Sequence, residues 1–357
     1  MNNPNLIALG WDTWFAEQAS ARCDPATSVA RVAAVDRDQL LLLDASGPFR
    51  ARLAGKLLYD AESSAERPCV GDWVRVEQSP ADQFGLVHGL LTRKTCLRRK
   101  AAGESIEAQM IAANVDVVIV VQSCHYDFNL KRLERYLVMA RDGGATPCIL
   151  LTKTDLVEPA VVAVQVAQIR SAGIDAPVLT LSNLTRDGMT ELQRVLEPGK
   201  TYCFVGSSGV GKSTLINGLV GRDVMETNLV SDTGEGRHTT VRRELIILAN
   251  GAMVIDNPGM REFGVLGTGG GIEASYADII ARAGRCRFRD CTYTNEPGCA
   301  VQQELASGEI DTEHYDNFLK LKKESAYHDL SYAGKRKKDK DFGRFIKSVK
   351  KGLKEDE

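Results

Sequence analysis

The feature that most constrains the fold is a glycine-rich segment between an apolar run and a helix-like run. Residues 202–205 read Tyr-Cys-Phe-Val, residues 206–214 read Gly-Ser-Ser-Gly-Val-Gly-Lys-Ser-Thr, and residues 215–219 read Leu-Ile-Asn-Gly-Leu. This order satisfies G-x-x-x-x-G-K-[ST] in a strand, loop and helix context. Such loops turn backbone N–H groups toward phosphate oxygens at a helix N-terminus. The segment therefore predicts a nucleotide-binding α/β domain.

The side chains of this phosphate-binding loop have separate expected roles. Lys212 offers a point charge to the β and γ phosphates, and Ser213 offers a hydroxyl to Mg²⁺. The other positions expected to contact the nucleotide are Gly206, Ser207, Ser208, Gly209, Val210, Gly211 and Thr214. The loop alone does not separate ATP from GTP, so the base must be read by another part of the chain.

A second motif follows an earlier apolar run, Cys-Ile-Leu-Leu at residues 148–151. It consists of Thr152, Lys153, Thr154 and Asp155, and it resembles the guanine-reading pattern N-K-x-D at the carboxyl end of a strand. Asp155 can accept hydrogen bonds from guanine N1 and N2, a donor pair that adenine lacks, while the stem of Lys153 covers the base. Thr152 stands in place of asparagine, which removes an amide that would brace the loop. The motif favours GTP over the alternative of a P-loop ATPase or nucleotide kinase.

Two further segments fit a GTP site. Residues 253–259 form an apolar strand that ends in D-x-P-G, which places Asp256 near Mg²⁺ through water and the N–H of Gly259 near the γ-phosphate. In residues 236–240, Thr239 is a candidate Mg²⁺ ligand, and His238 is expected beside the γ-phosphate. The expected GTP site also includes Ser182 and Asn183. Segments of this kind are ordered by the γ-phosphate and released on hydrolysis.

The order of the motifs is unusual, because the guanine-type motif precedes the phosphate-binding loop. Apolar strands alternate with amphipathic helices from residue 116 to residue 205, which indicates a parallel sheet covered on both faces. The same sheet can be built in this order if the chain is circularly permuted, with its opening just after D-x-P-G. Nucleotide state could then move the segment that follows this opening.

The flanking segments have different patterns. Residues 1–28 carry apolar side chains at roughly helical spacing, so a short amphipathic segment is expected there. Residues 29–100 contain short alternating strands and predict a small β-barrel, for which the OB-fold is the commonest type with a binding role. The permuted GTPase domain then spans residues 101–267, and a cysteine-bearing helical domain with a basic tail spans residues 268–357, where the glycine-rich residues 268–275 are expected to form a flexible connection.

Composition narrows the location and the partners. The chain is 43% hydrophobic and 26% charged, and it has neither an apolar run of about 20 residues nor a basic-then-apolar start, so we expect a cytoplasmic protein without a membrane partner. Its nine cysteines are odd in number and mostly lie in apparent strands, which indicates reduced thiols. Residues 331–357 hold ten Lys or Arg against five Asp or Glu, which favours a polyanionic partner.

The motif order, the barrel before it and the cysteines after it resemble the RsgA (YjeQ) family of circularly permuted bacterial GTPases. The matching segments also include Val-Gly-Asp-Trp at 70–73, Ala-Ala-Asn-Val-Asp at 112–116, Asp-Phe-Asn-Leu at 127–130 and Pro-Gly-Met-Arg-Glu-Phe-Gly at 258–264. The resemblance implies a monomer that hydrolyses GTP with Mg²⁺, is stimulated by the small ribosomal subunit, binds that subunit's rRNA and acts in its late maturation. A different class of function, a GTP-binding rRNA scaffold with negligible hydrolysis, stays open.

The resemblance also assigns the catalytic residue and a metal site. Met260 follows Gly259 and cannot orient water, so the family points to His238 for that role. The family arranges Cys-x4-Cys-x-His-x5-Cys around structural zinc. Cys286, Cys291 and Cys299 match this pattern, but Tyr293 occupies the histidine position. Structural Zn²⁺ takes four ligands, so the fourth is His314, His328 or a water, or else the site is metal-free.

Basic side chains near the end of the barrel are the expected RNA contacts, together with the start of the tail. They are Arg93, Lys94, Arg98, Arg99 and Lys100 in the first group and Lys335, Arg336, Lys337, Lys338 and Lys340 in the second. Neutralising several phosphates would give salt-sensitive affinity without sequence preference.

Overall fold

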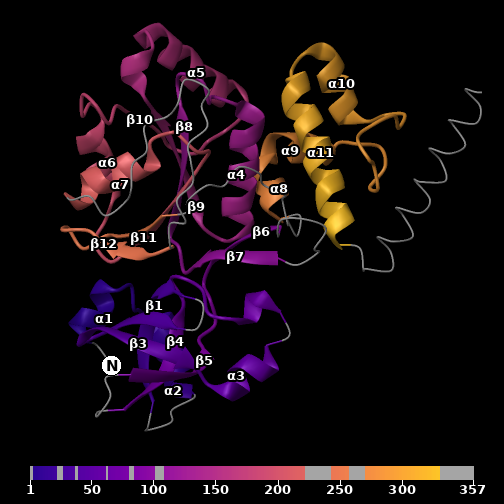
Figure 1. Cartoon of the computed structure of the whole chain (residues 1–357). Helices are drawn as coiled ribbons and strands as arrows, with labels where there is room; N and C mark the ends of the chain where they lie inside the picture. The colour runs from indigo at the N-terminus through magenta and orange to yellow at the C-terminus, as the bar shows by residue number, and fades with distance from the viewer. Residues whose placement is uncertain are drawn as a thin grey trace, which may run out of the picture.

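The computed structural model describes residues 3–21, 27–36, 39–61, 63–79, 84–100, 108–221, 243–256 and 270–329. A β-barrel, a sheet covered by helices and a small group of C-terminal helices lie side by side, with the barrel at the bottom of Figure 1 and the C-terminal helices at the upper right. No helix within these ranges is long and apolar enough to span a membrane.

The barrel has the strand order of an OB-fold. Its strands are β1 (Ser28–Val35), β2 (Leu40–Asp44), β3 (Gly47–Leu53), β4 (Trp73–Ser79) and β5 (Phe84–Leu90). They close in the order β1-β2-β3-β5-β4, and β3 pairs with β5 in parallel while the other pairs are antiparallel. Alternating residues along each strand fill the interior, as Val74 and Val76 do from β4. The predicted barrel is confirmed.

The N-terminal segment forms two helices, α1 (Pro4–Ala8) and α2 (Thr13–Ala21), that dock on the barrel. Asn3 caps α1 by accepting a hydrogen bond from the N–H of Asn5 at 3.0 Å. Between and within these helices, Trp11 and Phe15 pack on the buried Trp73 at ring-centroid distances of 4.8 and 5.8 Å. The aromatic contact explains why this short segment is ordered on the barrel.

A third helix, a short 3-10 turn and a hairpin lead from the barrel to the next domain. The helix is α3 (Gly55–Asp60), the turn is η1 (Ser64–Glu66), and the hairpin is β6 (Cys96–Lys100) with β7 (Ala108–Ala113). Gly71, with φ of +93°, approaches the hairpin so closely that a Cβ there would overlap the carbonyl oxygen of Ala113. The glycine of the Val-Gly-Asp-Trp segment is therefore required by the contact between barrel and hairpin.

The second domain is built on a six-stranded sheet in the order β10-β9-β8-β11-β13-β12. Its strands are β8 (Val117–Ser123), β9 (Thr146–Thr152), β10 (Val178–Leu181), β11 (Thr201–Val205), β12 (Leu245–Ile247) and β13 (Met253–Asp256). All neighbours are parallel except the edge strand β12. Its helices are α4 (Leu130–Asp142), α5 (Pro159–Ser171), α6 (Met189–Val195) and α7 (Lys212–Val220), and a 3-10 turn η2 (Thr154–Leu156) follows β9.

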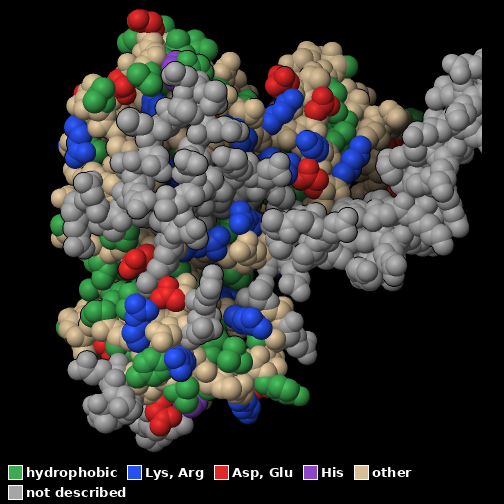
Figure 2. Space-filling model, viewed as in Figure 1, with side chains coloured by type: hydrophobic (Ala, Val, Ile, Leu, Met, Phe, Trp, Pro, Cys, Tyr) green, Lys and Arg blue, Asp and Glu red, His purple; other side chains and the backbone are tan. Residues whose placement is uncertain are grey.

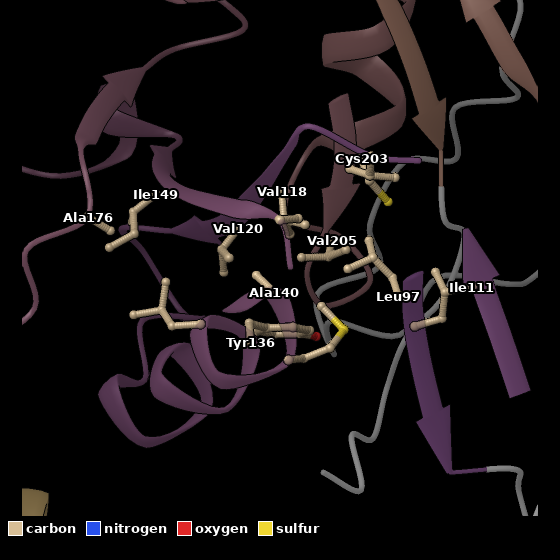
Figure 3. Packing of buried hydrophobic residues seen from close by; sticks show 14 of the residues in the cluster. Leu97, Ile111, Val118, Val120, Tyr136, Ala140, Ile149, Ala176, Cys203 and Val205 are labelled. Atoms are coloured by element: carbon tan, nitrogen blue, oxygen red, sulfur yellow. The ribbon is translucent and has the colours of Figure 1, made fainter. Parts of the chain in front are cut away.

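This sheet carries the core of the protein. Nearly every residue of β8 and β11 is buried, as expected for strands covered on both faces. In Figure 3, Tyr136 of α4 faces Val118, Val120 and Val205 of the sheet, while Leu97 of the hairpin lies beside the same cluster. The hairpin therefore shares one core with the second domain.

The C-terminal helices are α8 (Gly270–Ser275), α9 (Ala277–Ala283), α10 (Ala300–Ser307) and α11 (Thr312–Asp329). The predicted flexible connection at 268–275 is wrong for its described part, because residues 270–275 form α8. The reason is packing: a Cβ on Gly271 would lie 2.6 Å from the carbonyl oxygen of Val138 and 2.6 Å from Cβ of Asp142. Glycine here permits close contact with α4, and it is not a sign of a loose linker.

Candidate nucleotide site

The phosphate-binding loop lies at the carboxyl end of β11, where ligands of open parallel sheets bind. Gly206, Gly209 and Gly211 have φ of +150°, +79° and +97°, values that L side chains rarely adopt. A Cβ on Gly206 would also overlap the carbonyl oxygen of Val121 in the neighbouring strand β8. The loop therefore has the backbone shape that the sequence motif requires.

The loop lysine is folded over the loop itself. Lys212 Nζ donates hydrogen bonds to the carbonyl oxygens of Gly206 at 2.8 Å and Ser207 at 2.6 Å. Burial lowers the pKa of Lys212 to about 8, while the nearby charges of Asp256 and Asp127 act in the opposite direction. Because the ammonium is already held over the cradle, an arriving phosphate would not have to order it.

Two carboxylates act on this lysine, and only one of them was expected. Asp256 is buried at the end of β13, as the D-x-P-G motif predicted. Asp127, in the loop between β8 and α4, was not singled out as a site residue. Its Oδ1 lies 2.7 Å from Nη2 of Arg132, and its Oδ2 is buried with no hydrogen-bond partner among the described residues. Burial raises the pKa of Asp127 against the effects of Arg132, Ser207 and Lys212. The Asp-Phe-Asn-Leu segment was the available signal for it.

The base-reading loops are held in place by short hydrogen bonds. Lys153 has φ of +58°, an uncommon left-handed conformation for a residue with a side chain, and such strain often marks a functional site. Ser182 Oγ donates to Oδ1 of Asp155 at 2.6 Å and accepts from the N–H groups of Leu184 and Thr185. The hydroxyl of Ser182 therefore fixes the orientation of the Asp155 carboxylate.

Thr152 braces the site, which corrects the expectation that it leaves the loop without support. Its buried Oγ1 lies 2.7 Å from the carbonyl oxygen of Val210 and 3.2 Å from that of Gln122. A second side chain, Asn183, donates from Nδ2 to the carbonyl oxygen of Gly211 at 3.1 Å. Both base-reading loops are thus tied to consecutive carbonyl groups of the phosphate-binding loop.

Some predicted residues lie outside the described ranges. These are His238, Thr239, Gly259 and Met260 of the nucleotide site, and the basic residues Lys335, Arg336, Lys337, Lys338 and Lys340 of the tail. The described sheet edge brings together Lys212, Asp256 and the loop that carries Asp155, from three different strands. Ser213 and Thr214 lie in the first turn of α7, directly after Lys212.

The cysteine cluster forms a separate potential metal site. The Sγ atoms of Cys286, Cys291 and Cys299 all lie within 4.8 Å of one another, and those of Cys286 and Cys299 are 3.9 Å apart. Zinc–sulfur bonds of about 2.3 Å in tetrahedral geometry place sulfur atoms about 3.8 Å apart, so the three thiols fit zinc. Tyr293 instead packs on Phe318 at a centroid distance of 5.9 Å.

His314 is wrong as a fourth ligand, because both of its ring nitrogens are engaged elsewhere. Nδ1 lies 2.5 Å from Oε1 of Glu134, and Nε2 lies 3.3 Å from Oδ1 of Asp278. The side chain of His328 falls outside the described part. Other cysteines behave as predicted: the reduced thiols Cys69, Cys124, Cys148 and Cys203 are free and buried.

Several basic residues expected to contact RNA are engaged within the protein. Arg93 is largely buried and lies 2.7 Å from the fully buried carboxylate of Asp72, so it holds the barrel together and is wrong as an RNA contact. Lys94 pairs with Asp12, and Arg99 Nε donates to Gln109 at 3.0 Å. On the face shown in Figure 2, basic side chains lie over both the barrel and the C-terminal helices, with acidic ones among them.

A phosphate-binding loop and a guanine-type reading loop, joined at one sheet edge in reversed chain order, define a circularly permuted P-loop GTPase. The strand order and the parallel register are those of such a domain even though its first strand in sequence, β8, lies in the middle of the sheet. Comparison with known proteins identifies the family within this class.

The sequence model of the RsgA GTPase family matches residues 90–266. The small ribosomal subunit biogenesis GTPase RsgA 2 of Listeria monocytogenes (serotype 4b, strain F2365) is 43% identical over 324 residues, 90% of each chain. The RsgA 2 protein of Lactiplantibacillus plantarum is 40% identical over 328 residues, 92% of this chain and 91% of the relative. This chain belongs to the RsgA GTPase family and is an enzyme that hydrolyses GTP with Mg²⁺.

Solved structures agree on the fold. YjeQ from Thermotoga maritima superposes with a TM-score of 0.63 at 23% identity, covering 84% of this chain and 99% of its own. YloQ, described as a circularly permuted GTPase, gives a TM-score of 0.61 at 24% identity, covering 86% and 97%. Both support the predicted arrangement of barrel and permuted GTPase domain.

Proposed function

We propose that this GTPase acts in the late maturation of the small ribosomal subunit and that the subunit stimulates its hydrolysis of GTP. The relatives that match over nine-tenths of the chain are named small ribosomal subunit biogenesis GTPases. The structural observation that carries the GTPase part of this proposal is the hydrogen bond from Ser182 to Asp155 beside a formed phosphate-binding loop, because it orients the carboxylate that would read guanine. The same bond disfavours an ATPase.

We assign the nucleotide contacts from the geometry of the site. Lys212 and the backbone of residues 206–214 bind the phosphates, and Asp155 with Lys153 binds guanine between the loops that carry Thr152, Thr154, Ser182 and Asn183. Ser213 and, through water, Asp256 would hold Mg²⁺, which would offset charge on the β and γ phosphates. The assignment of Thr239 to Mg²⁺ and of Gly259 to the γ-phosphate rests on the sequence motifs alone.

We assign the orientation of the attacking water to His238. The support is chemical, because Met260 carries no group that could hold a water, and it rests on the family pattern. His238→Ala should abolish subunit-stimulated turnover and leave GTP affinity within about twofold, since the histidine would act mainly in the transition state. Normal stimulated turnover in this variant would remove His238 from the mechanism.

The three thiols are assigned to structural zinc. Zinc would tie the loop that carries Cys286 and Cys291 to the start of α10 at Cys299. With Tyr293 turned onto Phe318 and His314 engaged, the fourth ligand is His328 or a water.

The proposed partner is the small subunit and its rRNA, bound by the barrel and the basic tail of a monomeric, cytoplasmic protein. An OB-type barrel that keeps a basic side chain such as Arg52 exposed supports this, as does the excess of basic residues after residue 331. Because such binding depends on phosphate neutralisation, it should weaken as salt increases.

The decisive test measures GTP and ATP hydrolysis by the full chain with and without purified small subunits, at low and high salt. Strong stimulation of GTP hydrolysis alone, lost at high salt, is the expected result. No stimulation, with GTP-dependent subunit binding intact, would overturn the catalytic role on the subunit and leave a GTP-binding scaffold.

A further inference from the structure

We propose that Thr152 is a positioning residue for the phosphate-binding loop and that this pocket therefore leaves N7 of guanine without a side-chain hydrogen bond from the guanine-reading strand. The inference rests on the guanine pocket proposed above and adds how selectivity is divided within it. It follows from where the single hydroxyl proton of Thr152 can go.

The surroundings of Thr152 Oγ1 determine that proton. Among the described residues, its two hydrogen-bond partners are the carbonyl oxygens of Val210 at 2.7 Å and Gln122 at 3.2 Å, and both can only accept. The side chain of Thr152 is fully buried at the end of β9, and it lies between the carboxyl end of β8 on one side and the phosphate-binding loop on the other. The shorter contact assigns the proton to Val210. Whichever carbonyl takes it, none remains for a base nitrogen.

Guanine presents N7 and O6 as acceptors on the edge away from Asp155, so reading that edge requires donors. An asparagine at position 152 would bring two N–H donors, enough to hold a loop carbonyl and still reach the base. A threonine brings one. With threonine in place of asparagine at position 152, the hydrogen bond to the loop carbonyl is kept and the hydrogen bond to the base is lost.

The brace acts on the part of the loop that matters for phosphate. The carbonyl of Val210 accepts from Thr152, and the carbonyl of Gly211 accepts from Asn183 at 3.1 Å. These two peptides immediately precede α7, whose first N–H groups face the phosphate position. A Cβ on Gly211 would lie 2.8 Å from the Asn183 amide nitrogen, so the glycine is needed for this approach. Two side chains from the base-reading loops thus shape the phosphate cradle.

The experiment measures dissociation constants of GTP and 7-deaza-GTP with the full chain in Mg²⁺, by competition against a fluorescent guanine nucleotide. The 7-deaza analogue replaces N7 with a C–H group and keeps the edge that Asp155 reads. The wild-type protein is expected to bind both within about twofold. A preference for GTP of about tenfold or more, the size of one good hydrogen bond, would overturn the proposal.

Three variants separate positioning from folding. Thr152→Val keeps the shape and removes the hydroxyl, so both nucleotides should bind about three- to tenfold more weakly with their ratio unchanged. Thr152→Ser keeps the donor and should bind like the wild type, which shows that any loss in the valine variant is not a folding defect. Thr152→Asn should acquire a preference for GTP over the analogue. Wild-type affinity in Thr152→Val, or no preference in Thr152→Asn, would each contradict the proposal.

A separate variant tests the pocket itself. Asp155→Asn should lose GTP and gain xanthosine triphosphate, because an amide complements the carbonyl that xanthine carries at C2. Unchanged GTP binding in that variant would mean that the guanine pocket is misplaced. That failure is distinct from failure of the Thr152 assignment, which concerns only the ratio between GTP and its 7-deaza analogue.

Discussion

The imidazole Nδ1 of His314 lies 2.5 Å from the carboxylate Oε1 of Glu134, and both side chains are less than 5% exposed. Glu134 belongs to α4 of the GTPase domain, and His314 belongs to α11 at the C-terminus. The other ring nitrogen faces Asp278 of α9 at 3.3 Å, and Asn317 donates to the second oxygen of Glu134. A buried charge pair therefore joins the C-terminal helices to α4, the helix that follows β8.

The first prediction concerns pH. Burial alone would lower the pKa of His314, but hydrogen bonds with Asp278 and Glu134 raise it to about 9. The folded pKa exceeds the unfolded value of about 6.5, so the contribution is complete below pH 6.5 and is lost as pH rises toward 9. We expect the C-terminal helices to lose protection from hydrogen exchange over that window. His314→Gln should remove the dependence, and the exposed His125→Gln should not. The same pH profile in all three proteins would refute it.

The second prediction uses two adjacent glycines with different surroundings. Gly271 lies against Val138 and Asp142 of α4, whereas an added Cβ on Gly270 meets nothing within 4 Å. Gly271→Ala should destabilise the docking of the C-terminal helices by about 1–3 kcal/mol through overpacking. Gly270→Ala should be neutral or slightly stabilising, because alanine favours helix. Limited proteolysis of the two variants distinguishes them, and equal resistance would argue against close packing of α8 on α4.

How much could be read from the sequence depends on how local each signal is. The phosphate-binding loop requires glycine conformations within nine consecutive residues, and the strand-helix alternation repeats over short windows. The loop motif and the strand-helix alternation both depend on residues that are close in sequence, so the permuted sheet and the location of Lys212 and Asp155 were predictable. The fold of the barrel followed in the same way from alternating strands.

The rest depends on contacts between distant segments. Glycines at 270 and 271 predict a linker from the sequence, but Gly271 packs against Val138 and Asp142 of α4, about 130 residues earlier in the chain. The sequence predicts Arg93 as an RNA contact, whereas in the structure it pairs with Asp72. Asp127 was not predicted as a site residue, because its effect on Lys212 depends on β8 and β11 being neighbours in the sheet. Composition and motif spacing do not predict contacts between residues that are far apart in the sequence.

The third prediction concerns the zinc site proposed at Cys286, Cys291 and Cys299. Tyr293→His restores the family ligand pattern, so a thiol-rich site with three sulfur ligands should gain an imidazole and release zinc more slowly to a chelator. Tyr293→Phe keeps the ring on Phe318 and should release zinc as the wild type does. The measurement follows free zinc with a colorimetric indicator. Faster release from the histidine variant would show that Tyr293 supports the site in its present form.

The fourth prediction concerns Arg31, which joins the barrel to the GTPase domain. The guanidinium is completely buried; it donates to the carbonyl oxygen of Leu9 and, at 3.3 Å, to that of Gly71. On the other side it donates to the carbonyl oxygen of Asn114 at 3.0 Å and to Thr201 Oγ1 at 2.8 Å. Burial lowers its pKa to about 10, so it stays charged at neutral pH.

Arg31→Met should therefore cost about 3 kcal/mol or more, because several buried acceptors lose their donor at once. Arg31→Lys should recover only part, since an ammonium cannot span the same four acceptors in one plane. Arg50→Met is the matched control, because Arg50 pairs with Asp36 at the surface and should contribute little. Urea unfolding, followed by tryptophan fluorescence for the barrel and by nucleotide binding for the GTPase domain, should give coincident transitions in the wild type and separated ones in Arg31→Met. Coincident transitions at unchanged urea concentration would show that Arg31 does not couple the two domains.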